Sequence, residues 1–220
     1  MLPKEIKLKF NPKIDSYSKL ELYISQALDN NFRLFGKRVP TFTIDLLYSR
    51  AELDKAVGLE TSEWVVGHTH KNRIYLLSPS VFEKASSHMV SDFLPVLTHE
   101  IAHIFTNEFL QILHPIWLYE GIAGYIAEQY HNRKINMIDN FSFLHDSKQW
   151  AKNSNYTQSY LFTNFLFKHF GLKKIYDFCK SVPQKIGKYN QAEAFFSYFD
   201  QFFEVKFIEL VKKWEITVKE

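Results

Sequence analysis

The sequence has few of the features that mark secreted or membrane-spanning proteins. Its 220 residues include one cysteine, Cys179. A single cysteine cannot form a disulfide within the chain, and this is typical of proteins from a reducing compartment. No apolar run is long enough to span a bilayer. Residues 1–9 alternate charged and apolar side chains, in place of the apolar core of a signal peptide. We therefore expect a cytoplasmic protein that does not act at a membrane.

The sequence also lacks a large charge of one sign. Its 27 Lys and Arg residues nearly balance 24 Asp and Glu residues, and the net charge is +3. This charge is too small to indicate nucleic-acid binding. Internal repeats and low-complexity linkers are absent as well. Hydrophobic residues make up 46% of the chain and 21 residues are Phe, so the composition indicates a globular protein with a sizeable core.

A His-Glu-x-x-His motif spans residues 99–103. Residues i and i+4 of a helix lie on one face, one turn apart, so His99 and His103 can bind one Zn²⁺ from the same side. Glu100 is adjacent to a ligand but points away from the row of ligands. It could therefore reach a water on the metal without coordinating the metal, as a general base must. The motif alone is a hypothesis that a second feature must support.

The second feature is the apolar stretch Trp-Leu-Tyr-Glu-Gly-Ile-Ala-Gly-Tyr at residues 117–125, which contains Glu120. An unpaired buried carboxylate is costly, and a metal ion is one of the few partners that can stabilise it. Ala123, Gly124 and Ala127 follow on the helical face of Glu120. Because these residues are small, we expect the helix of the two histidines to approach closely enough for Glu120 to reach their metal.

Together the two stretches resemble the gluzincin metallopeptidases, whose signature is HExxH followed by a downstream glutamate ligand. The second stretch is similar to the W-x-x-E-G-x-A-x-Y run of the aminopeptidase N-like and peptidase MA-like families, and a weaker resemblance covers roughly residues 40–215. The resemblance implies that His99, His103 and Glu120 bind zinc and that Glu100 is the catalytic base. It also implies a peptide or protein substrate.

Two features of related enzymes are missing. Thermolysin-like enzymes have an aspartate four residues after the ligand glutamate, and Gly124 occupies that position here. Another group, such as a backbone carbonyl, must then fix the tautomers of the histidine ligands. The G-x-M-E-N run that binds the substrate's amino terminus in aminopeptidase N-like enzymes is also absent. We therefore expect an endopeptidase and not an aminopeptidase.

The oxyanion formed during peptide hydrolysis needs a further hydrogen-bond donor. Related enzymes supply a Tyr or His from their helical part, and this implies Tyr156, with Tyr160 one turn later as the alternative. The competing interpretation is that both are packing residues. The chain has 12 tyrosines, and a buried tyrosine commonly packs with its hydroxyl group satisfied.

Residue periodicity and turn signals predict the secondary structure. Strands are predicted over residues 5–10, 41–48, 64–66 and 73–77. Helices are predicted over residues 16–34, 50–57, about 91–109, 115 to about 131, 156–170, 172–181, 192–201 and 205–214, and residues 132–154 are predicted to be a loop with one short helix. The regular part of the third of these helices is predicted to start near residues 93–95, so that Pro95 lies in its first turn, and a kink at Pro95 is the alternative.

Residues 67–72 are predicted to join two strands as a hairpin loop. His68 and His70 would then be exposed loop residues, which we favour over a second metal site. The strand over residues 73–77 is expected at the edge of the sheet, where an extended peptide could pair with it.

These expectations combine into a single zincin-like catalytic domain of the α+β class over residues 1–220. Residues 1–112 would form a lobe with a small mixed sheet and the HExxH helix. Residues 113–220 would form a helical lobe that supplies Glu120, with zinc in the cleft between the lobes. The predicted function is zinc-dependent peptide hydrolysis with Glu100 as base. The alternatives are a catalytically silent zinc protein that binds peptides or regulates a partner, and a zinc hydrolase of a non-peptide amide.

Overall fold

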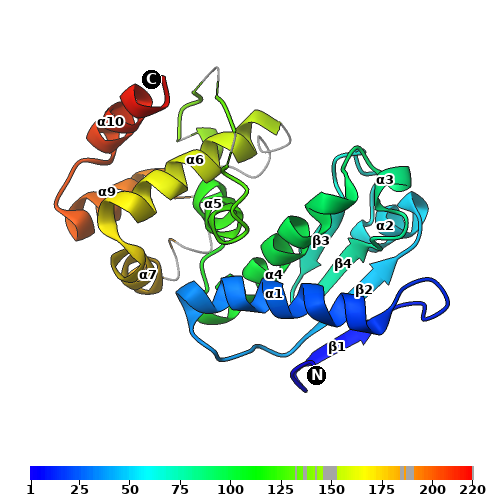
Figure 1. The fold of residues 1–220 in the computed structure, drawn as a ribbon. Helices are drawn as coiled ribbons and strands as arrows, with labels where there is room; N and C mark the ends of the chain where they lie inside the picture. Colours follow the sequence, from blue (N-terminus) through cyan, green and yellow to red (C-terminus); the bar gives the residue numbers. More distant parts are fainter. Residues whose placement is uncertain are drawn as a thin grey trace. The chain divides into compact units, whose positions relative to one another are not determined.

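A computed structural model describes residues 1–131, 133–135, 138–141, 143–145, 153–183, 186 and 191–219. The described chain has an α+β fold with a mixed four-stranded sheet (Figure 1). It divides into two compact units, Met1–Glu108 and Phe109–Glu220. The first unit contains the sheet, and the second is built from helices. Within the described residues, no helix has both the length and the apolar character needed to cross a membrane.

The sheet of the first unit has the strand order β1-β2-β4-β3. Its strands are β1 (Ile6–Lys9), β2 (Phe42–Leu47), β3 (Gly67–His70) and β4 (Arg73–Leu77). The β1–β2 and β2–β4 pairs are parallel, and the β3–β4 pair is antiparallel. Alternate residues of β2 and β4, such as Ile44 and Ile74, are buried on one face of the sheet. This alternation is typical of a sheet that is covered by helices on one side.

The β3–β4 hairpin differs from the prediction. The strand expected over residues 64–66 lies instead at Gly67–His70, so His68 and His70 are strand residues and not loop residues. Their rings stack 6.5 Å apart on one face of β3. The turn consists of Lys71 and Asn72, and Lys71 takes the left-handed conformation, with φ of 53°, that a two-residue hairpin turn requires. A polar Gly-His-Thr-His run gives no hydrophobic signal for a strand.

The edge strand was also predicted wrongly. The strand at residues 73–77, β4, lies between β2 and β3 and is therefore interior. Among the described strands, β3 and β1 form the two edges. The apolar sequence of β4 fits an interior strand, and the polar sequence of β3 fits an edge.

The helices of the first unit are α1 (Tyr17–Phe35), α2 (Arg50–Val57), the short α3 (Phe82–Ala85) and α4 (Phe93–Phe109), which a 3₁₀ turn, η1 (Val90–Asp92), precedes. The predicted ends of α2 are confirmed. Ser49 Oγ accepts a hydrogen bond from the Glu52 N–H, and Gly58 closes the helix with φ of 86°. Pro95 lies in the first turn of α4, as predicted.

Helix α4 is buried because α1 packs along it (Figure 1). The rings of Phe32 and Phe35 contact Phe105, which has no exposed surface. Asn31, also fully buried, donates through Nδ2 to the Thr98 carbonyl at 3.4 Å. The HExxH motif therefore lies on a helix that is fixed by its neighbours over most of its surface.

The second unit contains α5 (Ile116–Ile126), the 3₁₀ turn η2 (Phe143–His145), α6 (Asn153–Phe170), α7 (Leu172–Ser181), α9 (Ala192–Phe203) and α10 (Phe207–Lys219). Helix α5 ends at Ile126, about one turn before the predicted end. Glu128 then takes a left-handed conformation with φ of 55°. Much of the predicted loop at residues 132–154 lies outside the described residues.

The core of this unit is aromatic. Trp117, fully buried in the first turn of α5, contacts the rings of Phe141, Phe162, Phe195 and Phe207. Such aromatic pairs contribute beyond the area that they bury. Phenylalanine side chains thus hold α5, the helix that carries Glu120, in place.

His145 is buried in this core beside the rings of Phe195 and Phe196. It has no exposed surface, and among the described residues neither of its ring nitrogens has a hydrogen-bond partner. Burial, and to a lesser extent the nearby His114, lowers the pKa of His145 from 6.5 to about 4. The folded protein therefore holds this imidazole in its neutral form near neutral pH.

We expect His145 to make the protein less stable in mild acid. The unfolded chain takes up a proton near pH 6.5 and the folded chain only near pH 4. Above pH 6.5 the free energy of unfolding is therefore not reduced by His145. As the pH falls toward 4, it decreases by on the order of 2 kcal/mol. His145→Leu should remove this pH dependence, whereas the exposed His131→Leu should keep it. Denaturant unfolding at pH 7 and about pH 4.5 measures the difference; equal acid losses in wild type and His145→Leu would contradict the assignment.

Candidate metal centre

Helix α4 places His99 and His103 one turn apart, with the Nε2 atoms of the two imidazoles close together. The two Nε2 atoms are 3.0 Å apart, and the rings lie edge to face at 89°. Two nitrogens that share a tetrahedral zinc at bond lengths of about 2.0–2.1 Å are separated by about 3.3 Å. The two side chains are only 7% and 5% exposed. The histidine pair is therefore close to the geometry of two ligands on one metal.

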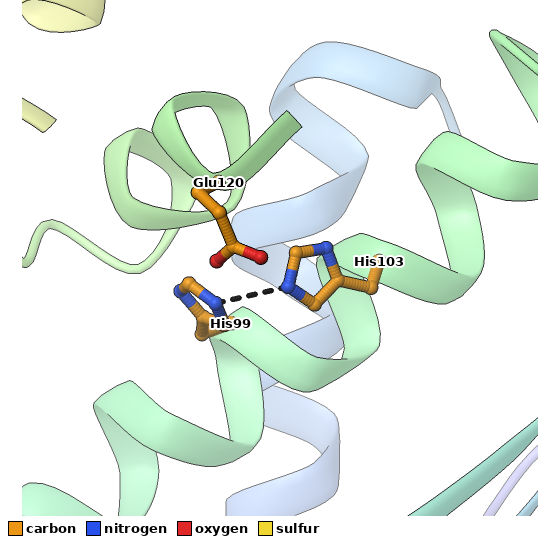
Figure 2. Close-up of side chains that lie close together, drawn as sticks. All are labelled: His99, His103 and Glu120. Atoms are coloured by element: carbon orange, nitrogen blue, oxygen red, sulfur yellow. Dashed lines mark hydrogen bonds between the residues drawn. The ribbon is translucent and has the colours of Figure 1, made fainter. Parts of the chain in front are cut away.

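Glu120 of α5 is the third member of this group. Its carboxylate points toward the two imidazoles (Figure 2). One ligand atom from each of His99, His103 and Glu120 lies within 4.8 Å of the other two. Within the described ranges, no other trio of His, Cys, Asp and Glu side chains meets this criterion. His68 and His70 in particular belong to no such trio.

The donor set fits zinc. Two neutral imidazoles and one carboxylate form a common ligand set of catalytic zinc sites, and they leave a coordination position open. The two histidines are buried, and Glu120 is partly buried. The three residues that the sequence predicts as metal ligands are the ones that the structure brings together.

Gly124, one of the small residues that follow Glu120, contacts a different helix from the one predicted. Ala123, Gly124 and Ala127 were expected to let the histidine helix approach α5, but Gly124 faces α6, as Gly121 does. A Cβ at Gly121 would lie 2.0 Å from Thr163 Oγ1, and one at Gly124 would lie 2.1 Å from the ring of Tyr160. The small residues therefore allow α6 to pack directly on the backbone of α5. This contact fixes the helix from the side and so fixes the position of Glu120.

Glu100 lies against the edge strand β3. Its side chain is 8% exposed, and its Oε2 accepts a hydrogen bond from Thr69 Oγ1 at 2.6 Å. Gly67 lies beside the same carboxylate, since a Cβ there would be 3.0 Å from Glu100 Oε1. The predicted base is thus a buried carboxylate that one strand holds in place, on the same helix as the two histidines.

Arg50 fixes the segment that leads into β3. Its guanidinium group donates to Thr61 Oγ1 at 3.0 Å, to the carbonyl oxygens of Ser62 and Glu63 at 3.3 and 3.0 Å, and to that of Val65. It also donates to the Ala85 carbonyl, at 2.5 Å. An arginine has five N–H donors in a rigid plane, so one side chain can hold several carbonyl groups at once. The start of β3, and with it Gly67, is positioned by these bonds.

Both candidate oxyanion donors lie on α6. Tyr160 is 4% exposed, its ring packs on Gly124, and the guanidinium of Arg133 lies 4.9 Å from the ring centre. Tyr156 is half-buried, and its ring meets that of Tyr160 edge to face at 6.1 Å. Tyr160 therefore has an evident packing role. The assignment of Tyr156 as oxyanion donor stays a prediction.

Sequence reasoning missed Gly67 and Thr69, which contact the predicted base. A weak signal for them is present, because residues two apart in a strand share one face of the sheet. Gly67 and Thr69 are two positions apart in the strand pair that precedes the HExxH helix. A contact of both residues with Glu100 could have been predicted from this spacing. The mistaken loop assignment for residues 67–72 concealed this spacing.

The comparisons with known proteins give no relatives. No model of a protein family, no curated protein and no solved structure matches the chain. The assignment of the metal centre therefore depends on the residues and their geometry.

We expect the purified protein to bind about one Zn²⁺ per chain. His99→Ala and His103→Ala should each lose the metal. Glu120→Gln should weaken binding by about a hundredfold or more, since replacing even the outer partners of metal ligands costs up to that factor. Elemental analysis after dialysis and competition with a zinc chelator measure both effects.

Two control variants match these changes. The double variant His68→Ala/His70→Ala removes a stacked histidine pair outside the trio, and Glu108→Gln removes an exposed carboxylate from α4. Both should keep the zinc content of the wild type. Full zinc occupancy in a His99→Ala/His103→Ala double variant would show that the metal binds elsewhere.

Proposed function

We propose that this protein is a zinc-dependent peptidase of the gluzincin type, with a zincin-like architecture and Glu100 as general base. The observation that carries the proposal is the meeting of His99, His103 and Glu120 in one group. The resemblance of both sequence stretches to gluzincins points to the same three residues. The buried, hydrogen-bonded state of Glu100 adds support, because a protein that only binds zinc has no need of that carboxylate.

In this proposal His99, His103 and Glu120 would hold the zinc. When bound, the zinc would supply Lewis acidity, which makes a water molecule more acidic and polarises the scissile carbonyl. Glu100 would accept the proton of the attacking water and pass it to the leaving amine. The low exposure of His99, Glu100 and His103 would strengthen their charge interactions, because little water is present to screen them.

The edge strand β3 is the proposed binding strand for the substrate. Val66 O accepts a hydrogen bond from Leu77 N at 2.9 Å, so Val66, and by alternation His68 and His70, direct their peptide groups toward β4. The N–H and C=O groups of Gly67 and Thr69 then point outward along the edge. An extended peptide could add to the sheet there, held by main-chain hydrogen bonds.

Glu100→Gln should separate chemistry from metal binding. We expect this variant to keep its zinc and to lose at least about a hundredfold in kcat, because general-base assistance is typically worth 10²–10⁴. Glu108→Gln, which changes an exposed carboxylate of the same helix, should retain the activity of the wild type. The assay is digestion of a proteome-derived peptide library by the zinc-loaded proteins.

Two outcomes of this assay would contradict the proposal. Equal cleavage by wild type and Glu100→Gln would exclude Glu100 as the base. A wild-type protein that binds zinc and peptides but leaves the library uncut would favour a peptide-binding or regulatory protein.

Substrate pairing with β3 predicts an alternating response to backbone methylation. In a cleaved peptide, N-methylation of one residue removes one main-chain donor and leaves the side chains unchanged. Methylation at alternate residues should raise KM by about fivefold, the value of one typical hydrogen bond, and methylation at the residues between should have little effect. Kinetics with a series of singly methylated peptides test this. Equal effects along the whole peptide would show that the substrate does not pair with an edge strand.

A further inference from the structure

The only side chain of β3 that donates a hydrogen bond to Glu100, among the bonds that the structure describes, is that of Thr69. Thr69 Oγ1 lies 2.6 Å from Glu100 Oε2 and 3.1 Å from the Glu100 carbonyl oxygen. A threonine hydroxyl has one proton, and a carboxylate is the stronger acceptor. The shorter distance agrees with this preference. The Thr69 proton is therefore directed at Oε2.

The other carboxylate oxygen, Oε1, lies beside Gly67. A Cβ at residue 67 would be 3.0 Å from both Oε1 and Cγ of Glu100. A side chain there would therefore press on the carboxylate, and its absence leaves space on the Oε1 side. Gly67 and Thr69 lie on the same face of β3, two positions apart, and together they define how the carboxylate is oriented.

We propose that Thr69 is a positioning residue for Glu100. By holding Oε2, Thr69 leaves Oε1 as the oxygen that accepts the proton of the attacking water and later releases it to the leaving amine. This inference rests on the proposed function, in which Glu100 is the base. It adds a residue that the sequence motif does not contain and that lies 31 positions before Glu100 in the chain.

The same two residues connect substrate binding with the orientation of the base. Gly67 and Thr69 direct their peptide groups toward the open edge of β3. The side chain of Thr69, and the position that a Cβ of residue 67 would occupy, lie toward Glu100. A substrate strand that pairs with their peptide groups would restrict the backbone of Thr69. It would therefore also restrict the hydroxyl group that orients Glu100, so that the base is held most firmly when substrate is present.

The kinetic test compares Thr69→Val, which removes the hydroxyl at nearly constant volume, with Thr69→Ser, which keeps it. We expect Thr69→Val to lower kcat about tenfold or more at unchanged zinc content, with KM within about twofold of the wild type, because a misplaced catalytic group slows the chemical step. Thr69→Ser should restore kcat to within about threefold of the wild type. Thr43→Val, on the opposite face of the sheet in β2, is the matched control and should keep wild-type kinetics.

A second test needs neither zinc nor substrate. Thr69→Val, Glu100→Gln and the double variant form a cycle whose thermal unfolding midpoints are measured on the metal-free protein. If the hydroxyl and the carboxylate interact, the midpoint shift of the double variant will differ from the sum of the two single shifts. Thr69→Ala replaces Thr69→Val in both tests if the valine variant does not fold.

The outcomes separate the inference from the proposed function. The role of Thr69 would be overturned if Thr69→Val kept the kcat of the wild type, or if Thr69→Ser lost as much kcat as Thr69→Val. In either case an inactive Glu100→Gln would still support Glu100 as the base. Additive midpoint shifts would likewise overturn it. Full activity in Glu100→Gln would overturn the proposed function itself, and a non-additive cycle would then show the Thr69–Glu100 contact without a catalytic role.

Discussion

The candidate metal site depends first on two imidazoles whose Nε2 atoms lie close together on one turn of a buried helix. The Nε2 atoms of His99 and His103 are 3.0 Å apart, and water has little access to either ring. At this distance one neutral imidazole can donate an N–H hydrogen bond to the other. In the proposed site a metal cation would take the place of that hydrogen bond between the two neutral rings, and the carboxylate of Glu120 would balance part of its charge. The helix geometry and the burial of this pair therefore support the proposal of a zinc site.

The first unit keeps this helix and the carboxylate of Glu100 in place through neighbours that are distant in the sequence. Helix α1 covers α4 with aromatic rings and with the buried amide of Asn31. Arg50 fixes the segment that enters β3. Strand β3 then holds Glu100 through Thr69. In the proposed peptidase the base would have to be well oriented, and this chain of contacts would provide that orientation for Glu100.

The sequence was sufficient wherever local chemistry decides the structure. The ends of α2 at Ser49 and Gly58 and the place of Pro95 in α4 follow from capping and proline rules, and the ligand spacing follows from the helical repeat. It was insufficient where tertiary contacts decide. Strand β3 has no apolar pattern of its own and forms by pairing with β4. Which helix packs on Gly121 and Gly124 is likewise set by the fold as a whole, so the sequence could show that they are small but not that they face α6.

The central claim is that one zinc ion is bound by two imidazoles and the carboxylate of Glu120. X-ray absorption at the zinc edge of the purified protein tests it directly. The account predicts nitrogen and oxygen neighbours at about 2.0–2.2 Å, with the scattering pattern of two imidazole rings, and a changed spectrum in Glu120→Gln. A sulfur neighbour at about 2.3 Å, or a spectrum that is identical in wild type and Glu120→Gln, would contradict it.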